Sequence, residues 1–154
     1  MQTQTDYELM EASLERAAEV CDDLTPLVYG RFFDAHPEAR TLFHMGERTR
    51  GRMLNEILAI LLELAQGHDY MPATVRELAK DHTSYGEISD GYYRGLLNAL
   101  TGVLADQLGS DWTSARERAW RVQAERLMEL VAQGVALCGG QTRASVTPSQ
   151  PANP

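Results

Sequence analysis

The chain has 154 residues, of which 44% are hydrophobic and 23% are charged, as expected for a globular domain with one full-sized core. Fourteen basic and twenty-two acidic residues give a formal net charge of −8. Nucleic acids and anionic membrane surfaces bind basic proteins, so neither is an expected partner of this acidic chain.

The expected location of the protein is the cytoplasm. Residues 1–6 have neither the basic start nor the apolar run of a signal peptide. The longest apolar run, Ile57–Leu62, is too short to span a bilayer. Cys21 and Cys138 lie far apart and do not have the spacing of metal ligands, so we expect reduced thiols.

The first part of the chain is predicted to form two helices and a short helical turn. Apolar residues at helical spacing predict a helix over Asp6–Cys21. Thr25 followed by Pro26 is typical of a helix start, with an N-cap residue before a proline at the first position. That helix is expected to end at His36, because the residue before a proline is displaced from the α region. Pro37 then opens the short turn.

The second part of the chain is also predicted to be helical. The predicted helices are Glu47–Gln66 ending at Gly67, Pro72 to near Tyr85–Gly86, Ser89–Asp90 to Leu108, and Trp112 or Thr113 to Leu137 before Gly139–Gly140. No run of residues alternates with period two. We therefore expect an all-α domain of six or seven helices over residues 1–138, as a bundle or a crossed stack. Residues 139–154, rich in Ser, Thr, Pro, Gln and Asn, are expected to be a disordered tail.

One histidine, His82, is predicted to lie on an apolar helix face. Val75, Leu78, Ala79 and His82 are spaced i, i+3, i+4 and i+7, so the imidazole joins a buried stripe. A buried imidazole needs a polar partner, and a metal ion is one such partner. The pattern alone is more typical of a hydrogen-bonded structural histidine.

Three blocks of sequence, in order along the chain, resemble one protein family. The segment Tyr29–Met45 (YGRFFDAHPEARTLFHM) resembles the opening of single-domain bacterial haemoglobins and of the haem domain of flavohaemoglobins. His82-Thr83-Ser84, with Tyr92 ten residues after the histidine, resembles their proximal region, and Ala119-Trp120 resembles a dipeptide of their final helix. The resemblance covers roughly residues 5–137. It implies a globin fold that binds one haem b group.

The resemblance also implies roles for individual residues. His82 matches the proximal ligand of the haem iron, Phe43 the aromatic side chain that packs on the porphyrin, and Tyr29 the distal hydroxyl that donates to a bound gas. Without the resemblance, Phe43 would be an ordinary core residue and Tyr29 a boundary tyrosine. The other expected haem contacts are Tyr92, in a hydrogen-bond network near the proximal histidine, Ile57, over the distal face, and Leu78, on the His82 stripe.

Two positions depart from the family pattern. Met53 stands where the family usually has a distal glutamine, and a thioether cannot donate a hydrogen bond. A one-residue shift would bring in Arg52 or Leu54 instead, and Met53 as a sixth iron ligand is a less favoured alternative to simple packing. Leu137 stands where the family has the acidic residue that polarises the proximal histidine. That change puts peroxidase-like or fast dioxygenase chemistry in doubt.

The expected function is reversible binding of dioxygen, or of carbon monoxide or nitric oxide, at a five-coordinate haem iron. The alternatives are nitric oxide dioxygenation with a separate reductase, a haem-based gas sensor with a partner protein, and a haem-free interaction module in which His82 is a core residue. We expect a monomer or a homodimer. Arg48, Arg50 and Arg52 are either partners of the haem propionates or a solvated helix face.

Overall fold

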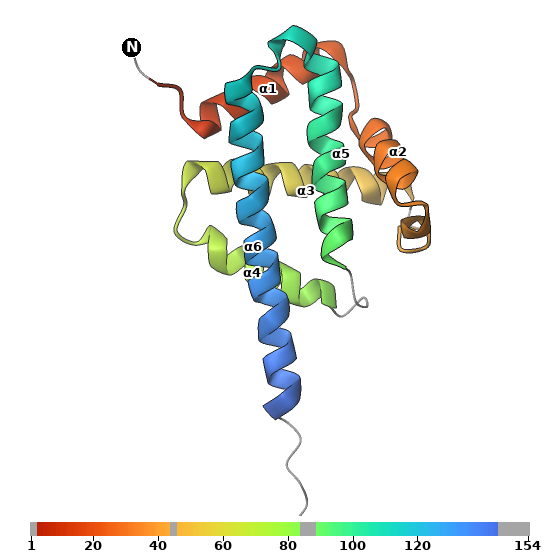
Figure 1. The fold of residues 1–154 in the computed structure, drawn as a ribbon, viewed down its shortest axis with the longest axis vertical. Helices are drawn as coiled ribbons and strands as arrows, with labels where there is room; N and C mark the ends of the chain where they lie inside the picture. Colours follow the sequence, from red (N-terminus) through yellow and green to blue (C-terminus); the bar gives the residue numbers. More distant parts are fainter. Residues whose placement is uncertain (1–2, 44–45, 84–88, 145–154) are drawn as a thin grey trace, which may run out of the picture.

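The computed structural model describes residues 3–43, 46–83 and 89–144, with side chains up to residue 138. Within this part of the chain every regular element is a helix, so the predicted all-α fold is confirmed (Figure 1). The α-helices are α1 (Asp6–Val20), α2 (Thr25–Ala35), α3 (Glu47–Gln66), α4 (Met71–His82), α5 (Asp90–Leu108) and α6 (Ser114–Ala144), and the 3-10 turns are η1 (Pro37–Thr41) and η3 (Gly109–Asp111).

Most helix ends lie within one residue of the prediction, because local signals set them. Gly67 ends α3 in the left-handed conformation, with φ of 76°, which glycine adopts without strain. The start of α2 differs slightly: Leu24 is the N-cap, and Thr25 is already helical. The backbone N–H of Thr25 donates to the Asp23 carboxylate at 2.9 Å, so Asp23 supplies the acceptor that was expected from Thr25.

The last helix differs from the prediction at both ends. It begins at Ser114, and it continues through Gly139–Gly140 to Ala144 instead of ending at Leu137. A glycine costs a helix only about 1 kcal/mol relative to alanine, so it does not end a helix that has helix-compatible residues after it. Residues 139–144 are therefore helical, and the remainder of the predicted tail, 145–154, lies outside the described residues. The predicted end near Tyr85–Gly86 also lies outside them.

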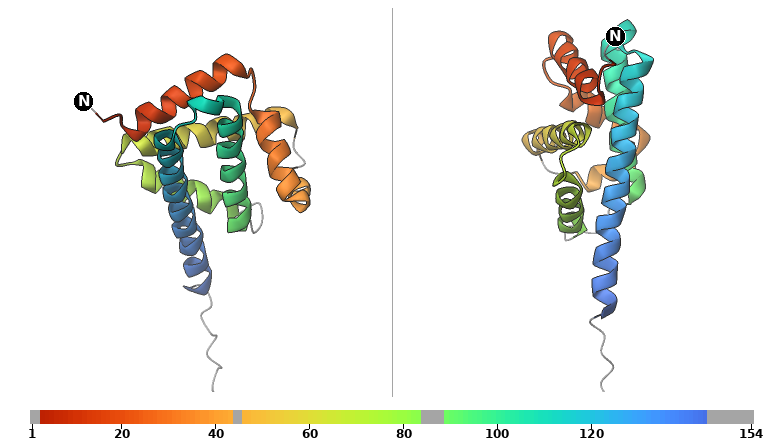
Figure 2. Two further views of the ribbon diagram at one scale, coloured as in Figure 1. Left: turned by 45° about the horizontal axis from the view of Figure 1, so that its top comes forward. Right: turned by 90° about the vertical axis from the view of Figure 1, so that its left-hand side faces the viewer.

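The helices form crossed layers. Figure 1 shows α5 beside the first part of the longer α6, with α3 crossing behind both helices and α4 crossing behind α6. In the right-hand view of Figure 2, α3 and α4 are seen nearly end-on in a layer beside α6. Helix α2 packs against α5, and α1 contacts α3, α5 and α6. No helix of the described residues is both long enough and apolar enough to cross a membrane.

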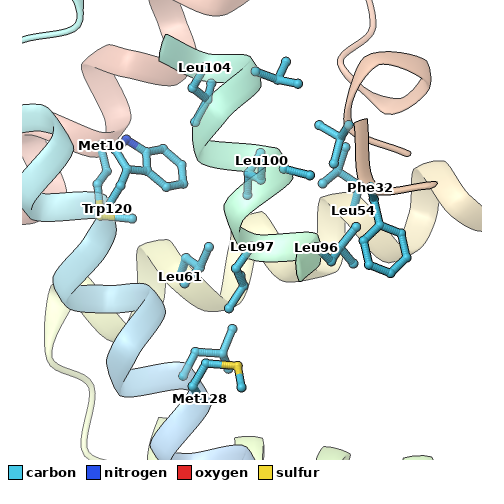
Figure 3. Packing of buried hydrophobic residues seen from close by; sticks show 14 of the residues in the cluster. Met10, Phe32, Leu54, Leu61, Leu96, Leu97, Leu100, Leu104, Trp120 and Met128 are labelled. Carbon is cyan, nitrogen blue, oxygen red and sulfur yellow. The ribbon is translucent and has the colours of Figure 1, made fainter. Parts of the chain in front are cut away.

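The core joins these layers. Trp120 and Met10 are both fully buried where α1 meets α6 (Figure 3). Leu61, Leu97 and Met128 come together from α3, α5 and α6 in the same view. Burying each such side chain contributes about 1.5–3 kcal/mol, so this contact holds the two layers in fixed relative positions.

Helix α4 lies very close to α6 at Gly134. A Cβ atom on Gly134 would be 2.5 Å from the carbonyl oxygen of Arg76 and 2.9 Å from the Cβ of Ala79. Backbone atoms cannot move aside as a flexible side chain can. The glycine therefore decides how near α4, which carries His82, sits to α6.

We expect Gly134→Ala to lower the free energy of unfolding by about 1–3 kcal/mol, the usual cost of overpacking. A chemical denaturation curve measures it. Gly30→Ala is the matched control, because a Cβ there meets nothing within 4 Å and alanine is the better helix former. Equal stabilisation by both substitutions would contradict the close approach.

Candidate functional site

A cavity lies between α3, α4, α5 and α6. Its volume is about 120 Å³, and the empty space that includes its opening to solvent is about 910 Å³. Its walls are almost entirely apolar. They consist of Phe43, then Met53, Glu56, Ile57 and Ile60 of α3, Val75, Leu78, Ala79 and His82 of α4, Tyr92, Tyr93, Leu96 and Leu97 of α5, and Leu127, Met128 and Val131 of α6.

The structure brings six of the seven residues predicted for the site together around this cavity. They are Phe43, Met53, Ile57, Leu78, His82 and Tyr92. Tyr29 is the exception, since it is not among the lining residues. Its ring packs against the ring of Phe43, with centroids 5.7 Å apart, so Tyr29 lies directly behind the cavity wall.

The register of α3 agrees with the ungapped count that selected Met53. Met53 lines the cavity, together with Ile57 and Ile60 at i+4 and i+7. Leu54 is 2% exposed but belongs to the core outside the cavity lining, and Arg52 is exposed. The α3 side chain at the position of the family's distal glutamine is therefore a thioether, which cannot donate a hydrogen bond.

Most of the lining from α5 and α6 was not predicted from sequence. Tyr93, Leu96 and Leu97 belong to a helix buried on several sides, where apolar residues do not form a single stripe. Leu127, Met128 and Val131 do have i, i+1, i+4 spacing. That spacing identifies a buried face but cannot distinguish a cavity wall from solid core.

His82 is the last residue of α4 and is partly buried at the cavity. Its Nδ1 lies 2.7 Å from the backbone carbonyl oxygen of Leu78. A carbonyl oxygen only accepts, so Nδ1 carries the proton and donates it to this bond. The lone pair of the neutral ring is then on Nε2, on the other side of the imidazole, and available to a metal.

No carboxylate within the described residues forms a hydrogen bond with His82. Leu137, the position matched to the family's acidic residue, is 57% exposed. The next residue of α6, Cys138, lies near the end of α4, with its Sγ 3.6 Å from the Thr83 hydroxyl. The hydrogen-bond partner of the imidazole is thus a neutral backbone carbonyl.

Tyr29 is 2% exposed, and its hydroxyl has no hydrogen-bond partner among the described residues. Burial raises the pKa of the Tyr29 hydroxyl to about 12, although the positive charge of Arg50 lowers this pKa in part. The phenol is therefore neutral and able to donate at physiological pH. Leaving such a donor unpaired costs about 1–3 kcal/mol, so an acceptor at this point would be bound favourably.

Tyr92 has different neighbours from those expected. Burial raises the pKa of its hydroxyl, and the charge of Glu38 and a hydrogen bond with it raise this pKa further. The ring lies edge-on to His36, with centroids 5.7 Å apart. No hydrogen bond joins Tyr92 to His82 among the described residues, so the expected network between them stays a prediction.

One imidazole in an apolar cavity matches a prosthetic group that brings its remaining metal ligands with it. The family model described as Globin matches residues 27–129. This span runs from the third residue of α2 through α5 into α6, and it contains His82 and the cavity lining up to Met128. The chain belongs to the globin family.

Proposed function

We propose that this globin holds haem b through His82 and reversibly binds dioxygen, or another diatomic gas, at the haem iron. The hydrogen bond from His82 Nδ1 to the Leu78 carbonyl carries the proposal, because it leaves Nε2 of a cavity-lining histidine free to coordinate. Globins as a family bind haem and diatomic gases. The finer assignment, to single-domain bacterial haemoglobins or flavohaemoglobin haem domains, is part of the proposal, as is a haem domain over residues 1–138.

The described residues fit a haem group. When bound, haem would supply an iron centre that can bind a diatomic gas. His82 would hold it from α4, and the bond to Leu78 orients the ring and raises its basicity. Ile57 and Phe43 would pack on the porphyrin and exclude water, since both side chains belong to the apolar lining of the cavity, which opens to solvent.

Tyr29 is the proposed hydrogen-bond donor to the gas. Its support is the buried hydroxyl that lacks a partner among the described residues, together with its contact to the wall residue Phe43. A neutral phenol in a dry surrounding stabilises partial negative charge on a bound gas. Met53 adds no second donor, so Tyr29 would act alone or with a water molecule.

The hydrogen-bond acceptor of His82, the Leu78 carbonyl oxygen, favours reversible binding over nitric oxide dioxygenation. A carboxylate partner would push more electron density onto the metal, whereas a backbone carbonyl does so weakly. Sustained nitric oxide consumption with an added reductase would favour the dioxygenase. A stable oxygenated protein under the same conditions would favour the binding protein.

The test of the proposal is the visible absorption spectrum of the protein, reduced and then exposed to carbon monoxide. A haem band that shifts on adding carbon monoxide is the expected result. A reduced spectrum that is already six-coordinate and low-spin would instead indicate an internal ligand such as Met53. Absence of a haem band after haem is added would contradict the proposal.

We expect Met53→Gln to slow dioxygen dissociation severalfold, since the amide adds one donor worth about 0.5–1.5 kcal/mol. Stopped-flow mixing of the oxygenated protein with carbon monoxide measures the rate. Met53→Leu is the matched control, because it removes the sulfur without adding a donor and should leave the rate unchanged. Equal rates in the parent and Met53→Gln would exclude Met53 from the gas side.

A further inference from the structure

Arg50 of α3 contacts both α2, the helix that carries Tyr29, and the segment that carries Phe43. It lies in the first turns of α3, and its Nη2 donates to the backbone carbonyl of Phe43 at 2.6 Å. Its guanidinium carbon lies 5.8 Å from the ring centroid of Tyr29 and 5.1 Å from that of Phe33, both on α2. One side chain thus contacts α2 and holds the segment that carries the cavity wall residue Phe43.

The polar atoms of Arg50 and Tyr29 are both incompletely paired. Arg50 Nε is buried without a partner among the described residues, as is the Tyr29 hydroxyl. Arg50 is partly buried beside an aromatic cluster, where a cation is costly unless its charge is compensated, and cation–π contacts with the rings compensate only part of it. Among the described residues, Arg50 is the charged group whose field acts on the phenol, and it lowers the pKa of Tyr29 against the effect of burial.

The neighbouring arginines do not share this environment. Arg48 and Arg52 are exposed on α3. The Arg40 guanidinium lies over the ring of Phe33, at 4.8 Å, and not over the ring of Tyr29. Arg40 therefore provides a cation in the same aromatic cluster that does not reach the phenol.

We propose that Arg50 is a positioning residue for gas binding: it fixes Phe43 against Tyr29, and its charge makes the Tyr29 hydroxyl a stronger hydrogen-bond donor. The inference rests on the proposed function of Tyr29. It assigns Arg50 to the gas side of the site and not to the haem propionates. A donor that carries more positive charge makes a shorter and stronger bond to a partly negative acceptor.

The first experiment is a double-mutant cycle on dioxygen dissociation. We expect Arg50→Met to speed dissociation roughly fivefold, the loss of charge assistance to one hydrogen bond. Methionine keeps an unbranched, apolar side chain of similar size but removes the charge and the donors. In the Tyr29→Phe background, Arg50→Met should change the rate less than about twofold, since the phenol through which Arg50 acts is gone. Arg40→Met is the control and should leave the rate unchanged in both backgrounds.

The second experiment follows the phenol itself. The protein is labelled with 3-fluorotyrosine, Tyr29→Phe identifies the Tyr29 resonance, and fluorine NMR follows its ionisation with pH. Arg50→Met should raise the midpoint, Arg50→Lys should restore it in part, and Arg40→Met should not move it. The measurement also works without haem, so failure to bind haem would overturn the proposed function and leave the effect of Arg50 on the phenol measurable.

The remaining outcomes contradict the inference. An unchanged phenol midpoint in Arg50→Met overturns the electrostatic role. Equal acceleration of dissociation by Arg50→Met in the parent and in the Tyr29→Phe background shows that Arg50 acts only through structure. Faster haem loss with an unchanged dissociation rate assigns Arg50 to a haem propionate.

Discussion

A His82→Gly variant is expected to lose the haem band that shifts with carbon monoxide, and added imidazole is expected to restore it. Removing the side chain removes Nε2, the only proposed ligand from the protein to the iron, while the apolar cavity remains. Free imidazole can enter the space left by the ring and supply the same nitrogen. Restoration by imidazole separates loss of a ligand from loss of the fold.

The structural cost of this substitution is expected to be small. His82 is at the end of α4, and its ring donates a hydrogen bond to Leu78 of the same helix. The net loss of such a bond is about 1 kcal/mol, with some further cost for a glycine at this position. Circular dichroism of the haem-free variant should therefore remain helical.

His68 offers a matched control for His82. It is exposed between α3 and α4, and its ring nitrogen pairs with the side chain of Gln66 at 2.6 Å. His68→Gly should keep the parent spectrum with and without imidazole. A full-strength haem band in His82→Gly without imidazole would show that His82 is not the haem ligand and is only a structural histidine.

Tyr29→Phe is expected to speed dioxygen dissociation by about tenfold or more, the loss of one to two hydrogen bonds. The same substitution should not destabilise the haem-free protein, and we expect a gain of about 1 kcal/mol. The reason is that the hydroxyl is buried without a partner among the described residues, so its removal abolishes a desolvation cost while the ring contacts with Phe33 and Phe43 remain. Stopped-flow kinetics and urea denaturation measure the two effects.

Tyr70→Phe is the control for both measurements. Tyr70 is 56% exposed, and its hydroxyl donates to Glu63 on the surface at 2.8 Å. Neither the dissociation rate nor the stability should change appreciably. A dissociation rate in Tyr29→Phe equal to that of the parent would remove Tyr29 from the gas side, and a large loss of stability would mean that its hydroxyl has a partner.

Because the pKa of Tyr29 is raised, the parent and Tyr29→Phe should differ in how their stability depends on pH above about pH 10. The pKa is about 12 in the folded protein and about 10 in an unfolded chain, so the unfolded state loses its proton first as the pH rises. Ionisation of this phenol therefore has no effect on stability below about pH 10, and it destabilises the folded parent progressively between about pH 10 and 12. The unfolding free energy of the parent should therefore fall relative to that of Tyr29→Phe over this range.

Local chemistry made most of the fold predictable from sequence. The interval Glu47–Gln66 was predicted in full because its apolar period is clear and Gly67 has a strong preference for the left-handed end of a helix. Pro37 likewise separates α2 from η1 through its effect on the residue before it. The predicted end of α6 was wrong because Gly139–Gly140 is only a weak signal for helix termination, and continuing the helix through two glycines costs little.

The sequence also identified the side of α4 that forms the cavity, because Leu78 and His82 are one turn apart on an apolar stripe. Only the tertiary structure decided which residues of α5 and α6 complete the walls, that Tyr29 stands behind Phe43, and that Arg50 reaches both. These contacts join segments that are distant in sequence, and their distances depend on how closely helices pack, as Gly134 does for α4 and α6. Periodicity describes one helix at a time, whereas a site is made where several helices meet.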